Sequence, residues 1–522
     1  MNTERSQGLD EGKMKKKPVL LGVAASLRNA RWGAGSQKLL DSLADIEDEE
    51  SLFSYLERES ELHLENFVNA GRKDGKDFLE IYDALKKSKG DRGLSNSEIA
   101  LAAALWAARN CGVEIDHLSL SEFFLPSGKV KNADLLRAKL LRADGLLLSG
   151  PVYFGDRGSL AQTFQNLICQ DEEIRSHFQG KPYAGLAVGA KRNGGQETCL
   201  IYQMWDMINA GLLGLGNDSE TTAQYGGTGH AGDVGTMHRD TYGLNTSMGA
   251  GRRIGSVLSL LSHEERVSDR LRVAFLILQD HEDRAYEWVS SVSEDCGESM
   301  RACIYALSDK RIMRCLACDI CPTHIDVDEE YRCIIKSTND YMGDIHRDLL
   351  YNDILIPVVM SRNDGAEVES NYQQFIERTR YLRRGDYVFS NNVVAPMVLE
   401  ELGSRENMPM RIMTSMIRHH TIMTRPIVGH LHEGEILNGR QVASEFREML
   451  EASRSIAGGR LAEVRSGLAE TKYNPVGYIL SADKNAEDEK RNERRVMMAD
   501  RMQKYEREAE KRLAPDRVIE RT

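Results

Sequence analysis

The stretch LLRADGLLLSGPVYFGDRGSLAQTFQNLI, residues 140–168, contains the pattern that decides the fold. An apolar run ends in a loop with Pro and Gly, and a segment with helical spacing follows it. Apolar runs bounded by turn residues are typical of strands buried on both faces, as in parallel sheets. The stretch therefore predicts one strand–loop–helix unit of a doubly wound α/β fold.

Three further stretches predict units of the same kind. They are KKPVLLGVAASLR (16–28), a strand and polar loop; SNSEIALAAALWAARNCGVEIDHLSL (95–120), a capped helix and a strand; and KPYAGLAVGAKRNGGQE (181–197), a strand and Gly-rich loop. In a parallel sheet the loops at the carboxyl ends of the strands form the ligand-binding edge.

A second copy of the deciding stretch occurs at residues 349–377, LLYNDILIPVVMSRNDGAEVESNYQQFIE. It repeats the double leucine, the aspartate (Asp144 and Asp353), the apolar strand and the helix. VAFLILQDHEDRAY (273–286) predicts the first strand of this copy, and DYVFSNNVVAPMVLEEL (386–402) a later one. We therefore expect an α/β protein with two tandem doubly wound parallel-sheet domains, at residues 18–262 and 263–460.

Three other segments flank or interrupt these domains. Residues 1–17 predict a disordered N-terminus. Residues from about 29 to 94 are acidic and helical, and we expect an insertion that is either a solvated helical hairpin or a lid over a ligand. Residues 461–522 are too charged to build a core, so we expect a solvated C-terminal helix or an arm that packs on a sister subunit of a homo-oligomer.

Composition narrows the class of protein. The 522 residues are 41% hydrophobic and 28% charged, which is typical of a globular chain with sizeable cores. The formal net charge of -12 argues against general binding to nucleic acid or to anionic membranes. Neither a secretory signal nor an apolar run long enough to span a membrane is visible, so we expect a cytoplasmic protein.

Polar and Gly-rich pieces stand at the predicted strand ends of the first copy: SLR (26–28), SNS (95–97), PVYFG (151–155) and RNGGQE (192–197). Hydroxyls and free N–H groups at a helix start suit an anion such as a flavin phosphate. The rings of Tyr153 and Phe154 suit a planar ligand. Their order on one sheet predicts a flavin site.

These stretches resemble the NADPH-dependent FMN reductase and iron-sulfur flavoprotein family, which has a flavodoxin-like fold, over nearly all of residues 18–260 apart from the insertion. The resemblance implies that FMN is the cofactor and that three groups of residues hold it. The phosphate would contact Ser26, Leu27, Arg28, Ser95, Asn96 and Ser97; the isoalloxazine would contact Pro151, Val152, Tyr153, Phe154 and Gly155; and Asn193, Gly194, Gly195 and Gln196 would complete the pocket.

The insertion separates the two halves of the phosphate loop, which is continuous in the family. An alternative alignment starts the helix at GAGSQKLL (33–40) and replaces Ser95 to Ser97 by Gly35, Ser36 and Gln37. We prefer the helix after Ser97, because it leads directly into a strand.

Four cysteines stand close together in MRCLACDICPTHIDVDEEYRC (313–333): Cys315, Cys318, Cys321 and Cys333. In the reducing cytoplasm such thiols are more often ligands than disulfides. The C-x2-C-x2-C spacing favours an iron-sulfur cluster, while zinc and plain thiols stay open. The resemblance extends to the compact cysteine set of iron-sulfur flavoproteins, which implies a 4Fe-4S cluster. The long gap before Cys333 departs from that pattern.

The second copy lacks the flavin features. LQDHEDR (278–284) stands where the first copy has AASLR, and its carboxylates would repel a phosphate. We expect FMN in the first copy and the cluster in the second, within reach of each other. A second flavin or a substrate at SRNDG (361–365) stays open.

The resemblance implies a flavin-dependent oxidoreductase that passes electrons from NAD(P)H or a ferredoxin-type donor through FMN and the cluster to an acceptor. No side chain stands out as a catalytic acid or base. The alternative is a non-catalytic electron carrier or assembly subunit that serves a partner enzyme, with the cysteines holding structural zinc.

Overall fold

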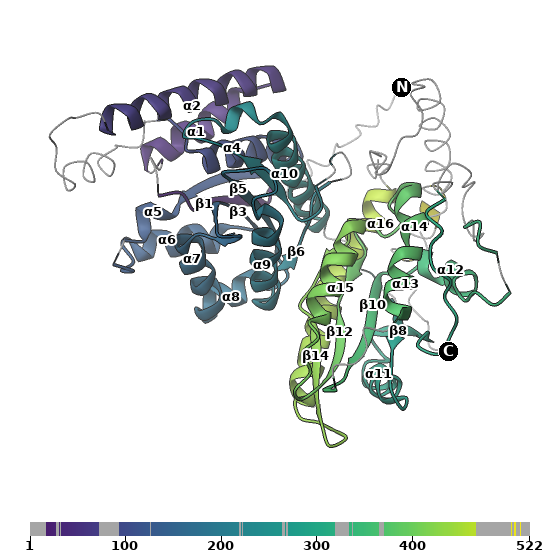
Figure 1. Ribbon diagram of the computed structural model, residues 1–522. Coiled ribbons are helices and arrows are strands. Elements are labelled where there is room, and N and C mark those ends of the chain that lie inside the picture. The colour runs from purple at the N-terminus through teal and green to yellow at the C-terminus, as the bar shows by residue number, and fades with distance from the viewer. Residues whose placement is uncertain are drawn as a thin grey trace, which may run out of the picture.

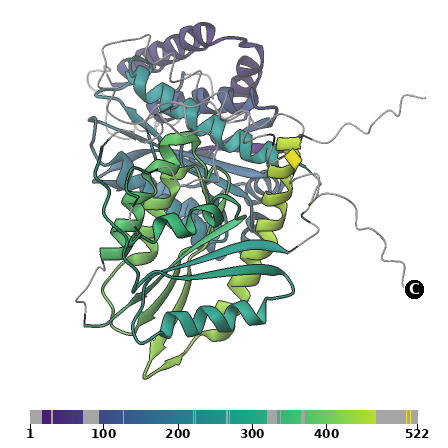
Figure 2. The same cartoon turned by 90° about the vertical axis from the view of Figure 1, so that its right-hand side faces the viewer.

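The computed structural model describes residues 17–27, 31, 33–71, 93–125, 127–218, 221, 223–263, 267, 270–318, 333–336, 338–364 and 370–465, together with 503, 506, 507 and 512. Among these residues, no helix is long and apolar enough to cross a membrane. Two lobes are visible in Figure 1, and Figure 2 shows the second lobe in front of the first.

The first lobe contains a parallel sheet with the flavodoxin-like strand order 2-1-3-4-5. Its strands, from edge to edge, are β2 (Glu114–Ser119), β1 (Val19–Ala24), β3 (Gly145–Tyr153), β5 (Pro182–Gly189) and β7 (Gly227–His230). The short strand β6 (Leu213–Gly214) also pairs with β5, and β4 (Asp156–Arg157) forms a small hairpin with β3. Every residue of β1 and β5 is buried, because helices cover both faces of these strands. Their sequences are therefore continuously apolar.

The second lobe repeats this strand order. Its parallel strands are β9 (Met300–Ala306), β8 (Leu271–Gln279), β10 (Ile354–Ser361), β12 (Met397–Glu401) and β14 (Ile427–His432). The short strands β11 (Val393–Val394) and β13 (Ile422–Met423) precede β12 and β14, and β15 (Glu435–Ile436) pairs with β14 at the edge.

Helices cover both faces of the sheet, and each face has its own apolar core. On one face lie α4 (Asn96–Arg109), α10 (Thr241–Leu261), α11 (Arg284–Asp295) and α16 (Gly439–Arg465). On the other lie α5 (Leu120–Phe123), α6 (Ala133–Arg142), α7 (Ser159–Gln170), α8 (Glu172–Phe178), α9 (Gln196–Asn209), α12 (Met342–Leu350), α13 (Ser370–Arg378), α14 (Arg380–Asp386) and α15 (Met408–Met416). Two 3-10 helices, η1 (Met237–Arg239) and η2 (Ile417–His419), are also present.

The aspartate shared by the two repeated stretches has the same contact in both lobes. Asp144 Oδ2 accepts the backbone N–H of Val19, at the start of β1, at 2.9 Å. Asp353 Oδ2 accepts the backbone N–H of Arg272, near the start of β8, at 2.8 Å. Each carboxylate therefore satisfies a backbone N–H in the first two residues of the strand beside it, which explains why both stretches carry an aspartate here.

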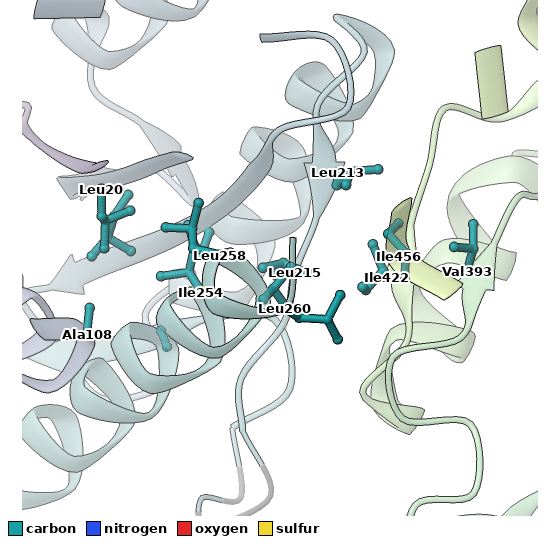
Figure 3. Packing of buried hydrophobic residues seen from close by; sticks show 14 of the residues in the cluster. Leu20, Ala108, Leu213, Leu215, Ile254, Leu258, Leu260, Val393, Ile422 and Ile456 are labelled. Atoms are coloured by element: carbon teal, nitrogen blue, oxygen red, sulfur yellow. The ribbon is translucent and has the colours of Figure 1, made fainter. Parts of the chain in front are cut away.

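The two lobes are joined into one sheet. Strand β13 pairs with β6 in antiparallel orientation, at Met423 and Gly214. Figure 3 shows Leu213 and Leu260 of the first lobe facing Ile422 and Ile456 of the second. Arg253, buried on α10, donates to the carbonyl of His420 at 2.6 Å.

This antiparallel join determines where the ligand-binding edges lie. Parallel strands end at one edge, so each lobe has its loops at one side, but the strands of the two lobes run in opposite directions where they meet. The carboxyl-end loops of the two lobes therefore do not share an edge. This arrangement argues against a short path between flavin and cluster within one chain, and their distance stays a prediction.

The insertion contains helices α1 (Ala34–Asp45) and α2 (Glu49–Gly71). Leu43, Leu52 and Leu56 are fully buried and belong to the same core as α4. Trp106 on α4 donates to the carbonyl of Ile46, between the two helices, at 3.0 Å. The solvated hairpin is therefore wrong, because these helices enlarge the core of the first lobe.

The C-terminal extension contributes a buried contact. The guanidinium of Arg512 donates to both oxygens of Asp353 at 2.8 Å, and both side chains are buried. Arg512 thus packs on the chain's own second lobe. Helix α16 runs through the expected border at residue 460, which stays a prediction.

Candidate functional site

The end of β1, the middle of β3 and the start of α4 meet at one place. The N–H of Ala25 donates to the carbonyl of Ser149 at 2.8 Å, and the hydroxyl of Ser149 donates to the carbonyl of Ser97 at 2.7 Å. Ser26 and Ser97 are both buried there. Two of the sequence-predicted phosphate segments are therefore adjacent, although Arg28 lies outside the described residues.

Helix α4 supplies backbone donors to this place. Its first intrahelical bond runs from the N–H of Ile99 to the carbonyl of Ser95, at 2.9 Å. The N–H groups of Asn96 and Ser97 precede that bond and stand outside the helical ladder. The positive end of the helix dipole and these donors favour an anion at this point.

The side chain of Ser95 is used within the helix cap. Its N–H and its hydroxyl both donate to Oε2 of Glu98, at 3.0 and 2.8 Å. Glu98 also accepts the N–H of Arg31 at 3.2 Å. Burial raises the pKa of the Glu98 carboxyl to about 7, against the opposing effect of these donors. Glu98 thus engages both the N–H and the hydroxyl of Ser95, and the Ser95 carbonyl accepts the N–H of Ile99, so the cap uses the groups that were predicted to contact a phosphate.

Asn96 connects α4 to the loop after β7. Its amide nitrogen donates to the carbonyl of Asp233 at 2.9 Å, and its oxygen accepts the N–H groups of Thr236 and Met237 at 3.1 and 3.2 Å. Its side chain therefore positions two loops at the site. The backbone N–H of Asn96 is therefore the group that could make the predicted phosphate contact.

The loop after β3 presents aromatic rings to solvent. Tyr153 is half exposed and Phe154 is fully exposed. Phe154 and Gly155 both have positive φ, at 53° and 81°, which turns the chain sharply into β4. Pro151 and Val152 are half-buried beneath this turn. Exposed rings on a fixed turn are suited to stacking on a planar ligand.

The loop after β5 touches the aromatic loop through two glycines. Gly195 has a φ of 98°, and a Cβ at this position would lie 2.5 Å from the Cα of Gly155. Asn193 also has positive φ, and a Cβ on Gly194 would lie 2.7 Å from the carbonyl oxygen of Lys191. The predicted ring-binding segments are therefore in direct backbone contact.

Gln196 fixes this loop and offers one acceptor. Its amide nitrogen donates to the carbonyls of Lys191 and Gly229 at 2.8 and 3.1 Å. The side chain is buried, and its Oε1 has no hydrogen-bond partner in the part of the chain that the structure describes. A buried acceptor without a partner is costly, so a ligand N–H at this place would stabilise it.

Arg192 is held by the protein. Its guanidinium pairs with Asp240, donates to the carbonyl of Thr228 at 3.0 Å and lies over the ring of Tyr242 at 5.0 Å. It is therefore a fixed part of the loop wall.

The matching position of the second lobe is filled by a carboxylate. Asp280, just after β8, accepts the N–H groups of Ala285 and Tyr286 at 2.8 and 3.0 Å. These donors belong to the first turn of α11, where an anion would otherwise bind. The acidic sequence of this loop thus prevents phosphate binding, and a second flavin does not fit at this helix.

The cysteine loop follows β9. Cys315 and Cys318 are half-buried and Cys333 is buried, whereas Cys321 lies outside the described residues. Burial raises the pKa of the Cys333 thiol, and the nearby thiols of Cys315 and Cys318 raise it further. The thiols of Cys315 and Cys318 thus influence the Cys333 thiol electrostatically, although the described residues hold no group of three or more His, Cys, Asp or Glu arranged to bind a metal ion.

The strand-end loops of the first lobe and the cysteine loop suit different prosthetic groups. The α4 donors, the exposed rings, the Gly155–Gly195 contact and the free acceptor of Gln196 fit a phosphorylated planar cofactor such as FMN. The thiols of Cys315, Cys318 and Cys333 are soft donors of the type that iron-sulfur clusters and zinc prefer, although the described residues do not arrange them as a metal site.

A family model matches part of the first lobe. The model of the family described as NADPH-dependent FMN reductase matches residues 90–205. This span begins just before α4 and includes the loops at 151–155 and 193–196. It includes the helix that we preferred for the phosphate loop and leaves out residues 33–40, and the choice between the two alignments stays a prediction.

Two curated relatives are iron-sulfur flavoproteins. The relative from Methanocaldococcus jannaschii is 32% identical over 189 residues, which are 33% of this chain and 96% of that protein. The relative from Methanosarcina thermophila is 26% identical over 182 residues, 32% of this chain and 90% of that protein. Among solved structures, a flavodoxin, WrbA-like protein from Agrobacterium tumefaciens is 12% identical, with a TM-score of 0.25, and covers 47% of this chain and 98% of its own.

Proposed function

Because the chain belongs to the NADPH-dependent FMN reductase and iron-sulfur flavoprotein family, we propose that its first lobe binds FMN at the strand-end loops and uses it to transfer electrons. The observation that carries the proposal is the meeting of three loops at one edge of the sheet. The start of α4, the aromatic loop and the Gly195 loop converge there.

Each group of residues would have a distinct task. The N–H groups of Asn96 and Ser97 would bind the phosphate, and Ser26 would lie beside it. Tyr153 and Phe154 would cover the isoalloxazine ring. Oε1 of Gln196 would accept an N–H from the edge of the ring. FMN, once bound, accepts two electrons and releases them singly, and the protein sets its position and potential.

We further propose that the cysteine loop holds an inorganic centre. A 4Fe-4S cluster on Cys315, Cys318, Cys321 and Cys333 is the form we favour, because both curated relatives are named iron-sulfur flavoproteins. Zinc on the same cysteines is the alternative, in which case the second lobe would be a structural module.

The two centres would exchange electrons through other molecules. From β5 to β9 the sheet crosses six strand pairs, through β6, β13, β11, β10 and β8. At about 4.8 Å per strand that separation is roughly 30 Å, and the two edges face different ways. This geometry favours exchange with NAD(P)H, with a ferredoxin-type protein or with another copy of the chain.

Anaerobic purification tests the proposal. We expect a yellow-brown protein that contains FMN, iron and acid-labile sulfide, and that oxidises NAD(P)H in steady state. FMN and iron with reduction by a redox protein alone would favour the electron-carrier alternative. A protein without flavin after FMN is added in excess would contradict the proposal.

A further inference from the structure

The segment that leads into the cysteine loop is held by a buried ion pair. Arg378, at the end of α13, and Asp340 are each 1% exposed in their side chains, and Nη2 of Arg378 lies 2.7 Å from Oδ2 of Asp340. Arg378 Nη1 also donates to the carbonyl of Met313 at 2.8 Å, and Asp340 Oδ1 accepts the N–H of Met313 at 3.2 Å. Both polar groups of one peptide residue are thus bound by the pair.

The position of Met313 in the sequence shows which parts of the chain this contact connects. Met313 stands just before Cys315, while Asp340 stands after Cys333, so the pair joins the two ends of the cysteine loop. Asn371, also on α13, holds the preceding residues by donating to the carbonyls of Leu307 and Ser308 at 2.7 and 2.8 Å. Helix α13 therefore fixes the path of the chain from β9 to the first cysteine.

The described residues of the corresponding connection in the first lobe, 120–125 and 127–132, show no such pair. After β2, Phe124 and Val130 form a backbone bridge, and the N–H of Leu125 donates to the carbonyl of Lys129 at 3.0 Å. A short hairpin is therefore sufficient to connect β2 to α6. A buried ion pair contributes little net stability compared with apolar packing, so its presence in the cysteine-bearing lobe calls for another reason.

We propose that Arg378 is a positioning residue for a metal centre, which acts through Met313 to hold Cys315 and Cys318 opposite Cys333. The inference rests on the proposed function, because it assumes that the thiols bind metal. Groups that orient ligands without touching the metal typically change metal affinity about 10-fold to 100-fold when they are removed.

The test uses the full chain, stripped of metal and reduced, with Co²⁺ as the probe. The thiolate-to-metal absorption band gives the affinity and reports the ligand geometry. We expect Arg378→Met to weaken Co²⁺ binding about tenfold or more. Arg378→Lys, which keeps the charge but cannot contact Met313 and Asp340 in the same way, should lie between that variant and the wild type.

The matched control is Arg512→Met. It also removes one partner of a buried Arg–Asp pair in the second lobe, but within the described part of the chain Asp353 contacts β8 rather than the cysteine loop. We expect Arg512→Met to bind Co²⁺ like the wild type. FMN content and the thermal midpoint of each variant show whether it is folded.

Two results would overturn the inference: unchanged Co²⁺ binding in Arg378→Met, or an equal loss in Arg512→Met, which would indicate general destabilisation. A wild-type chain that takes up no Co²⁺ on its thiols and purifies without iron would instead contradict the metal centre of the proposed function, and this inference with it.

Discussion

At the scale of single residues, the contact between Gly155 and Gly195 is what closes the candidate flavin site. Both glycines have positive φ, and no side chain fits between their backbones. The sequence shows Gly-rich loops at both positions, but residues 155 and 195 meet only through the fold. Their conformational freedom was predictable, whereas their contact was not.

Gly195→Ala should weaken FMN binding strongly. The new Cβ would lie 2.5 Å from Gly155, so the two loops would have to separate. The control is Gly112→Ala, since Gly112 also has positive φ but an added Cβ there meets no atom within 4 Å. FMN titration followed by flavin fluorescence gives both affinities. Equal effects of the two substitutions would mean that backbone strain, and not the loop contact, matters.

Glu98 should make the stability of the first lobe depend on pH. Burial raises the pKa of its carboxyl to about 7 from 4.5, so the folded protein binds more protons than the unfolded chain between these values. Stability is therefore full below about pH 4.5 and falls by about 3 kcal/mol as the pH rises through 7.

Glu98→Gln removes this titration. Urea unfolding at pH 5, 6, 7 and 8 should show a flatter pH dependence in the variant than in the wild type. Because other groups titrate too, the difference between the two curves is the relevant quantity. Parallel curves would show that Glu98 does not titrate in this range.

The roles of Ser95 and Asn96 illustrate why residue functions were only partly predictable. Sequence reasoning correctly identified a cap at the start of this helix, as the Ser95–Glu98 contact shows. The partners of Asn96 lie at residues 233–237, far along the chain, and no local pattern indicates them. The backbone donors of α4 follow from helix geometry alone, so they could be predicted.

At the scale of elements, the insertion differs most from its expectation. Its acidic composition suggested a solvated hairpin, because the average over the segment hides a narrow apolar stripe. Leu52, Tyr55 and Leu56 follow helical spacing and are all buried. That periodicity was the signal that predicts a packed helix.

Leu52→Ala should destabilise the first lobe by about 2–5 kcal/mol, as expected for a buried leucine. Leu64→Ala is the control on the same helix, because Leu64 is 38% exposed and should cost far less. Chemical unfolding monitored by circular dichroism gives both free energies. Equal and small losses of unfolding free energy in the two variants would instead support a solvated hairpin.

The strands were the most predictable elements. Continuous apolar runs identified β1, β3, β5, β8 and β10, because a strand buried on both faces leaves a simple pattern. The short strands β6 and β13 were not predicted, since two paired residues leave no pattern in the sequence. These short strands nevertheless join the lobes.

At the scale of the whole molecule, the antiparallel join makes the two lobes one continuous sheet. The strand order of each lobe follows from the repeated sequence pattern, but their relative orientation depends on contacts between distant segments. This is why the distance between flavin and cysteine loop could not be predicted from the order of the motifs.

Ile422→Ala should test the coupling of the lobes. Ile422 is fully buried in β13, at the join, and its truncation should cost about 2–5 kcal/mol. If the lobes unfold together, the release of FMN from the first lobe should shift to lower temperature as well. Thermal release is measured by the rise of flavin fluorescence. An unchanged release temperature, with a lowered transition for the rest of the protein, would show independent lobes.

The most direct test of the account is the amount of FMN bound per chain after anaerobic purification and FMN saturation. The loops of the first lobe fit FMN, whereas Asp280 occupies the equivalent helix start in the second lobe. We therefore predict one FMN per chain. A chain that binds none would contradict the site in the first lobe, and a chain that binds two would contradict the role given to Asp280.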